Sequence, residues 1–526
     1  MAQKDFKKYK TMGKKIEKEH RRKHIKKVPI ATSNLKQKKI TDFKKDFRRR
    51  IKEGPMLLYI FLAFIIMVSI FQLFRTINSD SWMAGTEPYY HLRIARQILE
   101  NGAVGEDGLS FGGRPYIFNP YDYLLAFCGK FVSIETASKI LPFIFSIIAM
   151  IFFYLLMKKA ELSLITRGFI LICLVATPAF LYSAMFSNSE IAGIAMLLIG
   201  FYLFIGKKES SFLFSMLFFI AASLFSFINF ISAVLISAFY TYKHAEKRTK
   251  FVLLLLSFLC ISPLYQLMFY RYGIPELPFK FGLAQLLAEL GALEGISIFG
   301  LILAVIGFFV LWNERAKFYL PYALLFFFAA AFILNANINL YLAFIISIFA
   351  GSALTFLIER RWWLKLVRNI SLALILFGLF FSAISFVGRA SASEPYPQLM
   401  NSLSWLDKNS RYQGIVFSHY KNGFWIEYFN KKSVTDENFI YAPELYERLN
   451  DSNEIFYSRN LERTEELLDK YNISYILITP DMKQGLVWKK EEEGLLFLLR
   501  NHEIFSMVHA ANSSRGIVEI WKYTKK

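Results

Sequence analysis

The stretch from Arg48 to Phe74, RRRIKEGPMLLYIFLAFIIMVSIFQLF, decides the fold, because three arginines lead within a few residues into a long segment without any charge. Residues 1–52 hold 21 Lys and Arg against 5 Asp and Glu, a net charge of +16. A bilayer-spanning helix needs about 20 apolar residues, and its basic flank stays on the cytoplasmic side. The basic segment is too long for a secretory signal peptide, so the pattern predicts a cytoplasmic tail, residues 1–52, and a retained first span.

The composition of the whole chain agrees with a membrane protein. Of its 526 residues, 55% are hydrophobic and 20% are charged, whereas soluble chains have roughly 45–50% apolar and about 25% charged residues. Disorder, a collagen-like fibre and a disulfide scaffold are excluded, since the three cysteines all lie in apolar runs. The net charge of +21 would also suit nucleic acid, but most of it lies in the tail, where the positive-inside rule explains it without a nucleic-acid partner.

Further apolar runs of near-spanning length follow the first, and together they predict eleven spans. The predicted spans lie at about 55–74, 139–157, 166–182, 190–206, 212–227, 229–242, 250–269, 297–312, 318–334, 338–357 and 367–387. The loops on one side are all basic, for example around Lys158, Lys207 and Arg360, whereas the opposite loops are long or poor in Lys and Arg. This alternation predicts a multi-pass cell-membrane protein with a cytoplasmic N-terminus and an extracytoplasmic C-terminal domain.

The predicted membrane domain comprises residues 53–389, with about 11–13 helices. Two of its external loops are long, residues 75–138 and 270–296, and we interpret the short apolar run 119–133 inside the first as interfacial. Residues 390–526 have a mixed polar composition and suffice for one soluble domain.

Alternating apolar runs in residues 390–526 predict strands at 414–417, 474–478 and 516–523, and an amphipathic pattern predicts a helix at 460–471. The fold class is therefore a polytopic α-helical membrane protein with a C-terminal α/β soluble domain.

Three carboxylates fall in loops on the predicted external face: Glu87, Glu190 and Glu289. Each has an ordinary explanation, since Glu is favoured near a helix N-terminus and acidic residues often lie at a membrane boundary. Residues 281–298 predict a helix lying in the interface, with a leucine stripe and Glu289 off that stripe. Three carboxylates from separate loops are what a hard cation such as Mg²⁺ or Mn²⁺ requires, and such an ion pairs naturally with a phosphate-bearing substrate.

Several runs resemble a known family. Glu87-Pro-Tyr-Tyr-His-Leu-Arg93 resembles the Asp-Pro-Tyr-Tyr-His-Leu-Arg segment of the catalytic subunit of oligosaccharyltransferase, a C-type glycosyltransferase. Ser187 to Glu190 resembles the second acidic motif of that family, and Ala288-Glu289-Leu290 its fifth external loop. Gly423-Phe424-Trp425-Ile426-Glu427-Tyr428 and Asp436-Glu437-Asn438-Phe439 continue the resemblance in the soluble domain, so that it covers nearly all of the chain after residue 55.

The resemblance implies a role for each of these residues. Glu87, Glu190 and Asn188, which stands where Asp is usual, would bind the metal, and Glu289 would join Glu87 in catalysis. His91 and Arg93 would contact the phosphate of a lipid-linked sugar donor.

The chain departs from the family where the acceptor binds. The Trp-Trp-Asp-Tyr-Gly motif, which holds the acceptor's Ser or Thr, corresponds to His419-Tyr420-Lys421-Asn422-Gly423, and a family Arg corresponds to Asn337. His419, Tyr420, Lys421 and Asn337 are therefore the candidate acceptor-binding residues. Replacing Trp-Trp-Asp by His-Tyr-Lys removes an acceptor of the hydroxyl hydrogen bond and reverses the local charge.

The sequence supports two alternative functions. The first is a membrane glycosyltransferase that moves a sugar or oligosaccharide from a polyprenyl-phosphate or polyprenyl-diphosphate carrier to a protein or glycan acceptor. The alternative is an inactive paralogue or an accessory membrane protein that binds glycan or a partner. A transporter is disfavoured, because the polar residues gather in loops and not at mid-helix.

Overall fold

The computed structural model describes residues 53–79, 82–110, 113–272, 283–333, 338–410, 414–439, 442–490 and 492–525. By its internal contacts the chain divides into two units, residues 1–59 and 60–526. The first unit contributes the first turns of helix α3 (Glu53–Ser79), and all other described elements belong to the second.

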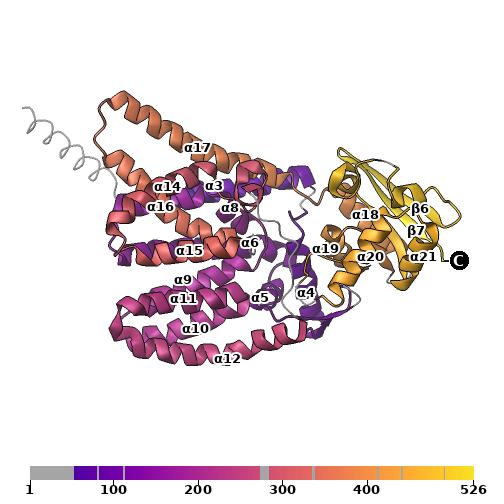
Figure 1. Cartoon of the computed structure of the whole chain (residues 1–526), viewed down its shortest axis with the longest axis horizontal. Helices are drawn as coiled ribbons and strands as arrows, with labels where there is room; N and C mark the ends of the chain where they lie inside the picture. Colours follow the sequence, from indigo (N-terminus) through magenta and orange to yellow (C-terminus); the bar gives the residue numbers. More distant parts are fainter. Residues whose placement is uncertain are drawn as a thin grey trace, which may run out of the picture. The chain divides into compact units, whose positions relative to one another are not determined.

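Helices occupy every place where an apolar run predicted a span (Figure 1). After α3 these are α6 (Ile134–Lys159), α7 (Leu164–Val175), α8 (Pro178–Met185), α9 (Glu190–Phe204), α10 (Glu209–Phe225), α11 (Phe227–Lys243), α12 (Arg248–Tyr272), α14 (Ile298–Leu311), α15 (Tyr319–Phe332), α16 (Asn339–Glu359) and α17 (Lys365–Ser391).

Within the described ranges, five of these helices are each long and apolar enough to cross a bilayer: α3, α6, α12, α16 and α17. The pair α7–α8 passes the same test as one bent span, and α9, α10, α11, α14 and α15 are apolar but shorter. The predicted multi-pass membrane character is therefore confirmed. That all eleven segments cross the bilayer stays a prediction.

The run 166–182, predicted as one span, is broken into α7 and α8, which meet at an angle of 65°. Pro178 begins the second helix and cannot donate a backbone hydrogen bond to the first. Thr177 before it adopts an extended conformation, as the residue preceding proline usually does. The break carries the chain toward the turn that contains Asn188 and Glu190.

Helix α16 forms the centre of the helical part, and it packs on α14, α7 and α15. Two glycines permit this close packing. A Cβ on Gly307 would lie 1.9 Å from the carbonyl oxygen of Phe349, and a Cβ on Gly351 would lie 2.4 Å from the backbone nitrogen of Ile170. Small residues bring helices together in this way where lipid surrounds them.

The first long loop contains the helices α4 (Glu87–Asn101) and α5 (Pro120–Gly129) and the two-stranded ribbon β1 (Glu106–Asp107) and β2 (Arg114–Pro115). Helix α4 ends at Asn101, and Gly102 after it closes the helix with a positive φ of 80°. Arg75, at the end of α3, is 2% exposed and donates to backbone carbonyls of Met83, Ser391 and Pro395. This side chain therefore joins the end of the first membrane helix, α3, to the end of the last one, α17, and to the start of the C-terminal part.

The interfacial helix predicted at residues 281–298 is wrong over its described part. Only the single turns α13 (Leu283–Leu286) and Ala288–Leu290 are helical. Gly291, at a φ of 113°, turns the chain, and the backbone of Ala288 bonds to Ile296. The leucine stripe indicated a helix, but the glycines at 291 and 295 permit a hairpin-like return in its place.

The C-terminal part is a five-stranded sheet in the order β4-β3-β5-β7-β6, surrounded by helices. Its strands are β3 (Ile415–Phe417), β4 (Lys432–Ser433), β5 (Ile473–Ile478), β6 (Phe505–Ser513) and β7 (Gly516–Tyr523), and its helices are α18 (Pro397–Asn409), α19 (Gly423–Tyr428), α20 (Leu445–Tyr457), α21 (Leu461–Lys470) and α22 (Leu495–Leu498). Strand β3 is parallel to β4 and β5, whereas β7 is antiparallel to β5 and β6. The three predicted strands and the predicted helix are confirmed, and so is the α/β class.

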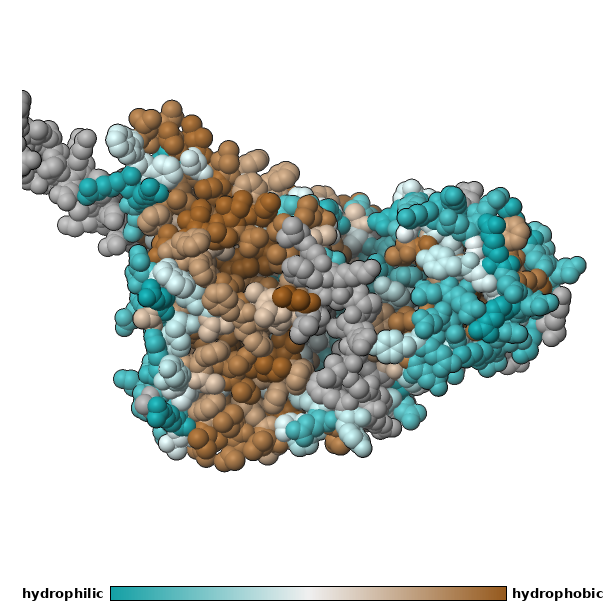
Figure 2. Space-filling model, viewed as in Figure 1, coloured by the Kyte–Doolittle hydropathy of each residue, from teal (hydrophilic) through white to brown (hydrophobic). Residues whose placement is uncertain are grey.

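The surface follows the same division. In Figure 2 a broad hydrophobic band covers the helical part, with hydrophilic atoms at its edges, and the C-terminal part is mostly hydrophilic. An apolar band with polar margins is the surface that a bilayer requires.

Candidate functional site

The start of helix α4 presents a carboxylate and an imidazole on one face. Glu87 and His91 are one helical turn apart, and Oε1 of Glu87 lies 3.4 Å from Nε2 of His91. The other ring nitrogen, Nδ1, lies 2.5 Å from Oδ1 of Asp122, a carboxylate of α5 that is fully buried. Although burial opposes the charge, Asp122 and Glu87 together raise the pKa of His91 to about 10. His91 is therefore an imidazolium, and its Nε2 side holds the Glu87 carboxylate in place.

Arg93, two residues after His91 on α4, pairs with other partners. Its guanidinium donates to both carboxylate oxygens of Asp107 at 2.6 and 2.7 Å and to Glu427 of α19 at 2.8 Å. Arg114 pairs with Asp436 at 3.1 Å in the same buried cluster. Arg93 was predicted to contact the donor phosphate, but this side chain is 7% exposed and joins the first loop to the C-terminal sheet.

The second acidic motif lies at the turn between α8 and α9. The Ser187 hydroxyl accepts a hydrogen bond from Ser138 at 2.6 Å and shares another with the Tyr121 hydroxyl at 2.7 Å, and these bonds hold the turn beside α5 and α6. Asn188 is 3% exposed, and its Oδ1 has no hydrogen-bond partner among the described residues. Glu190 opens α9 and lies within electrostatic reach of Glu87 and Glu294.

Glu289 has hydrogen-bond partners outside this group. Its carboxylate accepts from the Ser382 hydroxyl at 2.6 Å and from the backbone N–H of Ile298 at 3.0 Å, so it links the loop to α17 and α14. Glu294, five residues on in the same loop, lies within electrostatic reach of Glu87 and Glu190. Burial and the charge of Glu87 raise the pKa of Glu294 to about 7, and the neighbouring Tyr182 hydroxyl opposes the rise. The hairpin at Gly291 is the reason, because it turns Glu294 inward.

A fourth carboxylate, Glu437, comes from the C-terminal sheet. It follows the carboxyl end of β4 and accepts a hydrogen bond from the Thr86 hydroxyl, next to Glu87. Burial raises the pKa of Glu437 to about 7, with a contribution from Glu87. Gly423 makes this placement possible, because a Cβ there would lie 2.6 Å from the backbone of Asp436.

The candidate acceptor residues His419, Tyr420 and Lys421 follow the carboxyl end of β3, the strand next to β4. The rings of His419 and Tyr420 are 4.1 Å apart, and burial together with Lys421 lowers the pKa of His419 to about 4. Lys421 is exposed and lies within electrostatic reach of Glu437. Asn337, the remaining candidate, lies outside the described residues.

Glu87, Asn188, Glu190 and Glu294 offer the oxygen atoms that a hard cation prefers. The unpartnered Oδ1 of Asn188 and the mutual repulsion of the carboxylates fit a bound cation. In the part of the chain that the structure describes, no three His, Cys, Asp or Glu side chains already converge on one point. By the chemistry of its oxygen donors the set fits a divalent ion, and the side chains would have to move to close around it.

Sequence reasoning missed Glu437 and Asp122 as members of this site. Glu437 was visible in the run Asp436 to Phe439, which resembles the family, but nothing in the run indicated which acid faces the membrane loops. Asp122 stood in the apolar run 119–133, where a buried carboxylate signals a partner.

Several solved structures share this fold. The oligosaccharyltransferase AglB from Archaeoglobus fulgidus, in complex with an inhibitory peptide and a dolichol-phosphate, matches with a TM-score of 0.61 and 14% identity over 89% of this chain and 74% of that one. ArnT from Cupriavidus metallidurans, bound to undecaprenyl phosphate, matches with a TM-score of 0.51 and 10% identity over 88% and 97%. The arabinofuranosyltransferase AftD from mycobacteria matches with a TM-score of 0.53 and 12% identity over 88% and 40%.

The chain has the fold of the membrane glycosyltransferases. The resemblance to oligosaccharyltransferase noted from the sequence is thereby confirmed at the level of the fold. The A. fulgidus enzyme has also been crystallised with Zn and sulfate, at a TM-score of 0.51 to this chain. No protein-family model and no curated protein sequence matches the chain.

Proposed function

We propose that the protein is a membrane glycosyltransferase that moves a sugar or oligosaccharide from a polyprenyl-phosphate or polyprenyl-diphosphate carrier to an acceptor. The observation that supports it best is the carboxylate cluster of Glu87, Glu190, Glu294 and Glu437, brought together from three membrane loops and the C-terminal sheet. The neighbouring folds also support it, since AglB and ArnT were solved with dolichol-phosphate and undecaprenyl phosphate.

In this proposal Glu87, Asn188, Glu190 and Glu294 hold Mg²⁺ or Mn²⁺. Such an ion, when bound, neutralises charge on the departing phosphate. His91 holds Glu87 in place and keeps its own proton, because its pKa is about 10. Glu289 positions the loop that carries Glu294, through its bonds to Ser382 and Ile298.

Glu437 is the group that we assign to the acceptor. In the transfer, the bond from the sugar's anomeric carbon to phosphate oxygen breaks and a bond to the acceptor's nucleophilic atom forms. The acceptor then loses a proton, and a carboxylate with a pKa of about 7 suits its uptake near neutral pH. His419, Tyr420 and Lys421 lie beside Glu437 and would contact the acceptor. They lack the Trp-Trp-Asp pattern, so an acceptor other than Asn-X-Ser/Thr is favoured.

The direct test is transfer from a lipid-linked glycan by the purified full chain, with Mn²⁺ or Mg²⁺ and with EDTA. We expect transfer that EDTA abolishes and added Mn²⁺ restores. Transfer that ignores EDTA and persists in Glu87→Gln would exclude the metal site. An absence of transfer to peptide, glycan and lipid acceptors alike would instead favour the accessory, glycan-binding role.

The orientation belongs to the same proposal: a cytoplasmic N-terminus, with the carboxylate cluster and the C-terminal sheet outside the cell. The basic loops between alternate helices support it. In a chain whose three native cysteines are replaced by serine, Lys408→Cys should be labelled by an impermeant thiol reagent in intact cells and Lys207→Cys should not. The opposite labelling pattern would invert the topology.

A further inference from the structure

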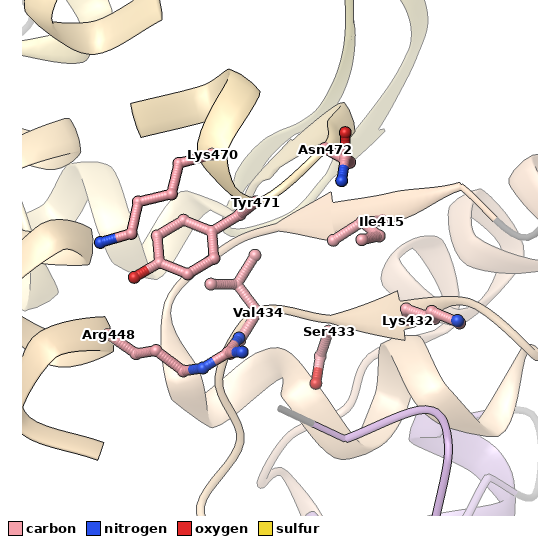
Figure 3. A pocket seen from close by; sticks show the side chains of 8 residues that line it. All are labelled: Ile415, Lys432, Ser433, Val434, Arg448, Lys470, Tyr471 and Asn472. Atoms are coloured by element: carbon pink, nitrogen blue, oxygen red, sulfur yellow. The ribbon is translucent and has the colours of Figure 1, made fainter. Parts of the chain in front are cut away.

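A small pocket opens in the C-terminal sheet at the end opposite to the carboxylate cluster. Glu437, His419 and Lys421 follow the carboxyl ends of β4 and β3, whereas the pocket is lined at the amino ends, by Lys432 of β4 and by Tyr471 and Asn472 just before β5. It is therefore separate from the site proposed for glycosyl transfer. Figure 3 shows the side chain of Arg448, from α20, entering it below Val434.

The charged residues that line this pocket are all cations: Lys432, Arg448 and Lys470. Lys470 is held on the outer side by Glu447 at 2.6 Å and by Asp451 at 2.5 Å. In the described part of the chain neither Lys432 nor Arg448 has an ion-pair partner. The local field is therefore positive, and two of the three cations are available to a ligand.

Arg448 has unused hydrogen-bonding capacity. A guanidinium offers five N–H donors, yet the described partners of Arg448 amount to one long bond, from Nη1 to the Val434 carbonyl at 3.5 Å. Its Nε is buried without a partner, and its guanidinium lies 5.1 Å from the centre of the Tyr471 ring. Stacking on the ring holds the guanidinium plane and leaves its edge for a planar oxyanion.

The size and walls of the pocket restrict the ligand further. Its volume is about 180 Å³, and a cavity of roughly 150 Å³ holds a six-membered ring such as benzene. Val434 and the Tyr471 ring supply apolar surface, and Asn472 supplies an amide. A bare inorganic ion would leave much of this space and all of the apolar surface unused.

We propose that this pocket binds one acidic sugar unit, with its carboxylate or phosphate on Arg448 and Lys432 and its ring against Tyr471 and Val434. A uronic acid and a sugar phosphate share this chemistry. The proposal does not depend on the transferase activity, because it uses no residue of the carboxylate cluster.

Binding of D-glucuronate, glucose 6-phosphate, glucose and inorganic phosphate to the full chain in detergent tests this proposal by calorimetry. We expect glucuronate or glucose 6-phosphate to bind, glucose not to bind, and phosphate to bind at least about tenfold more weakly, since it lacks the ring. Glucuronate and glucose 6-phosphate separate the carboxylate source from the phosphate source. Equal binding of glucose, or phosphate binding as tightly as either acidic sugar, would overturn the assignment.

Variants locate the site. Arg448→Gln should weaken binding about tenfold or more, as expected for a lost charged hydrogen bond. Lys432→Gln should weaken it by about threefold, because Lys432 is half-buried and solvent still screens its charge. Arg459→Gln is the matched control, because Arg459 is an exposed arginine nearby that stacks on Phe497 outside the pocket. A thermal melt without ligand shows whether Arg448→Gln still folds. If that variant does not fold, the affinity of Lys432→Gln tests the pocket instead. Unchanged affinity in both variants would exclude this pocket.

Discussion

Two groups of buried charge lie along helix α4, and they differ in balance. Around Arg93 the charges are paired: Asp107 and Glu427 accept from its guanidinium, and Asp436 accepts from Arg114. At the start of the helix the charges are mostly of one sign, with the carboxylates Glu87, Glu190, Glu294 and Glu437 near one another. The Arg93 group holds three carboxylates against two guanidiniums, and burial together with Asp436 raises the pKa of Glu427, so that a bound proton completes its balance. The one-signed group has only the His91 cation, and it is costly unless a metal cation or further protons join it. We therefore infer that the Arg93 group stabilises the fold, and that the carboxylates at the start of α4 bind a cation or substrate.

The paired group should carry the largest stability effect. Arg93→Met would leave Asp107 and Glu427 buried without their partner, and breaking a buried pair from one side costs about 3–5 kcal/mol. Arg96→Met is the matched control on the same helix, because the Arg96 side chain is 36% exposed and its pair with Glu135 lies at the surface. Exposed pairs contribute at most about 1 kcal/mol.

Chemical denaturation in detergent or nanodiscs measures both variants. Equal destabilisation by the two substitutions would show that the Arg93 group is not the architectural one.

The one-signed group should instead carry the largest activity effect. Glu87→Gln removes a charge with little change of shape, and losing one group that stabilises charge in a transition state costs about 10²–10³-fold in rate. Folding stability should stay the same or rise, because the substitution relieves repulsion from Glu190 and Glu294. Glu100→Gln, at the exposed end of the same helix, is the control and should retain full transfer activity. A Glu87→Gln protein that loses stability and activity together would place Glu87 with the paired group.

The sequence predicted the membrane helices and the α/β class well, because both depend on the local spacing of apolar residues along the chain. Runs of apolar residues predicted the membrane helices, and alternation predicted β5 and β7. It also placed Glu87 and His91 one helical turn apart and Glu190 at the start of a span, and the structure has α4 and α9 begin at these two glutamates. Their catalytic roles stay predictions.

The sequence failed where a loop or a distant strand decides the geometry. The choice between Glu289 and Glu294 depends on the turn at Gly291, and the leucine stripe favoured a helix that the structure does not contain. Arg93 reads as a free cation in the sequence, because its partners Asp107 and Glu427 are 14 and 334 positions away. Such long-range pairs leave no local pattern.

Two glutamates in one loop, Glu289 and Glu294, test which carboxylates belong to the one-signed group. Glu294→Gln should weaken Mn²⁺ binding about 10- to 100-fold, because Glu294 lies within reach of Glu87 and Glu190. Glu289→Gln changes the same residue type five positions earlier and should leave the affinity nearly unchanged, since its carboxylate is bonded to Ser382 and Ile298. Electron paramagnetic resonance of free Mn²⁺ measures both. The reverse order of effects would restore Glu289 as the cation ligand.

The smallest expected effect concerns pH. The pKa values of Glu294 and Glu437 are both about 7, above the ordinary value of 4.5. In the cation-free protein the folded state therefore binds more protons than the unfolded state between about pH 4.5 and 7, so stability should fall as the pH rises through that window. A divalent cation competes with these protons, and its affinity should rise about tenfold per pH unit up to about pH 7 and then level off.

His91 stays charged over this whole range, because its pKa is about 10, so the change belongs to the carboxylates. Melting temperatures from pH 5 to 8 should fall with rising pH in the cation-free protein and fall less with saturating Mn²⁺, because the ion offsets only the raised pKa of Glu294. Glu437→Gln should flatten the cation-free curve. The Arg93 group offers the internal contrast, because its charges are already paired. If Arg93→Met showed the same pH-dependent response to Mn²⁺ as the parent chain, shifted only in overall stability, the two groups would be independent. Loss of that response would mean that the paired group also holds the carboxylates in place.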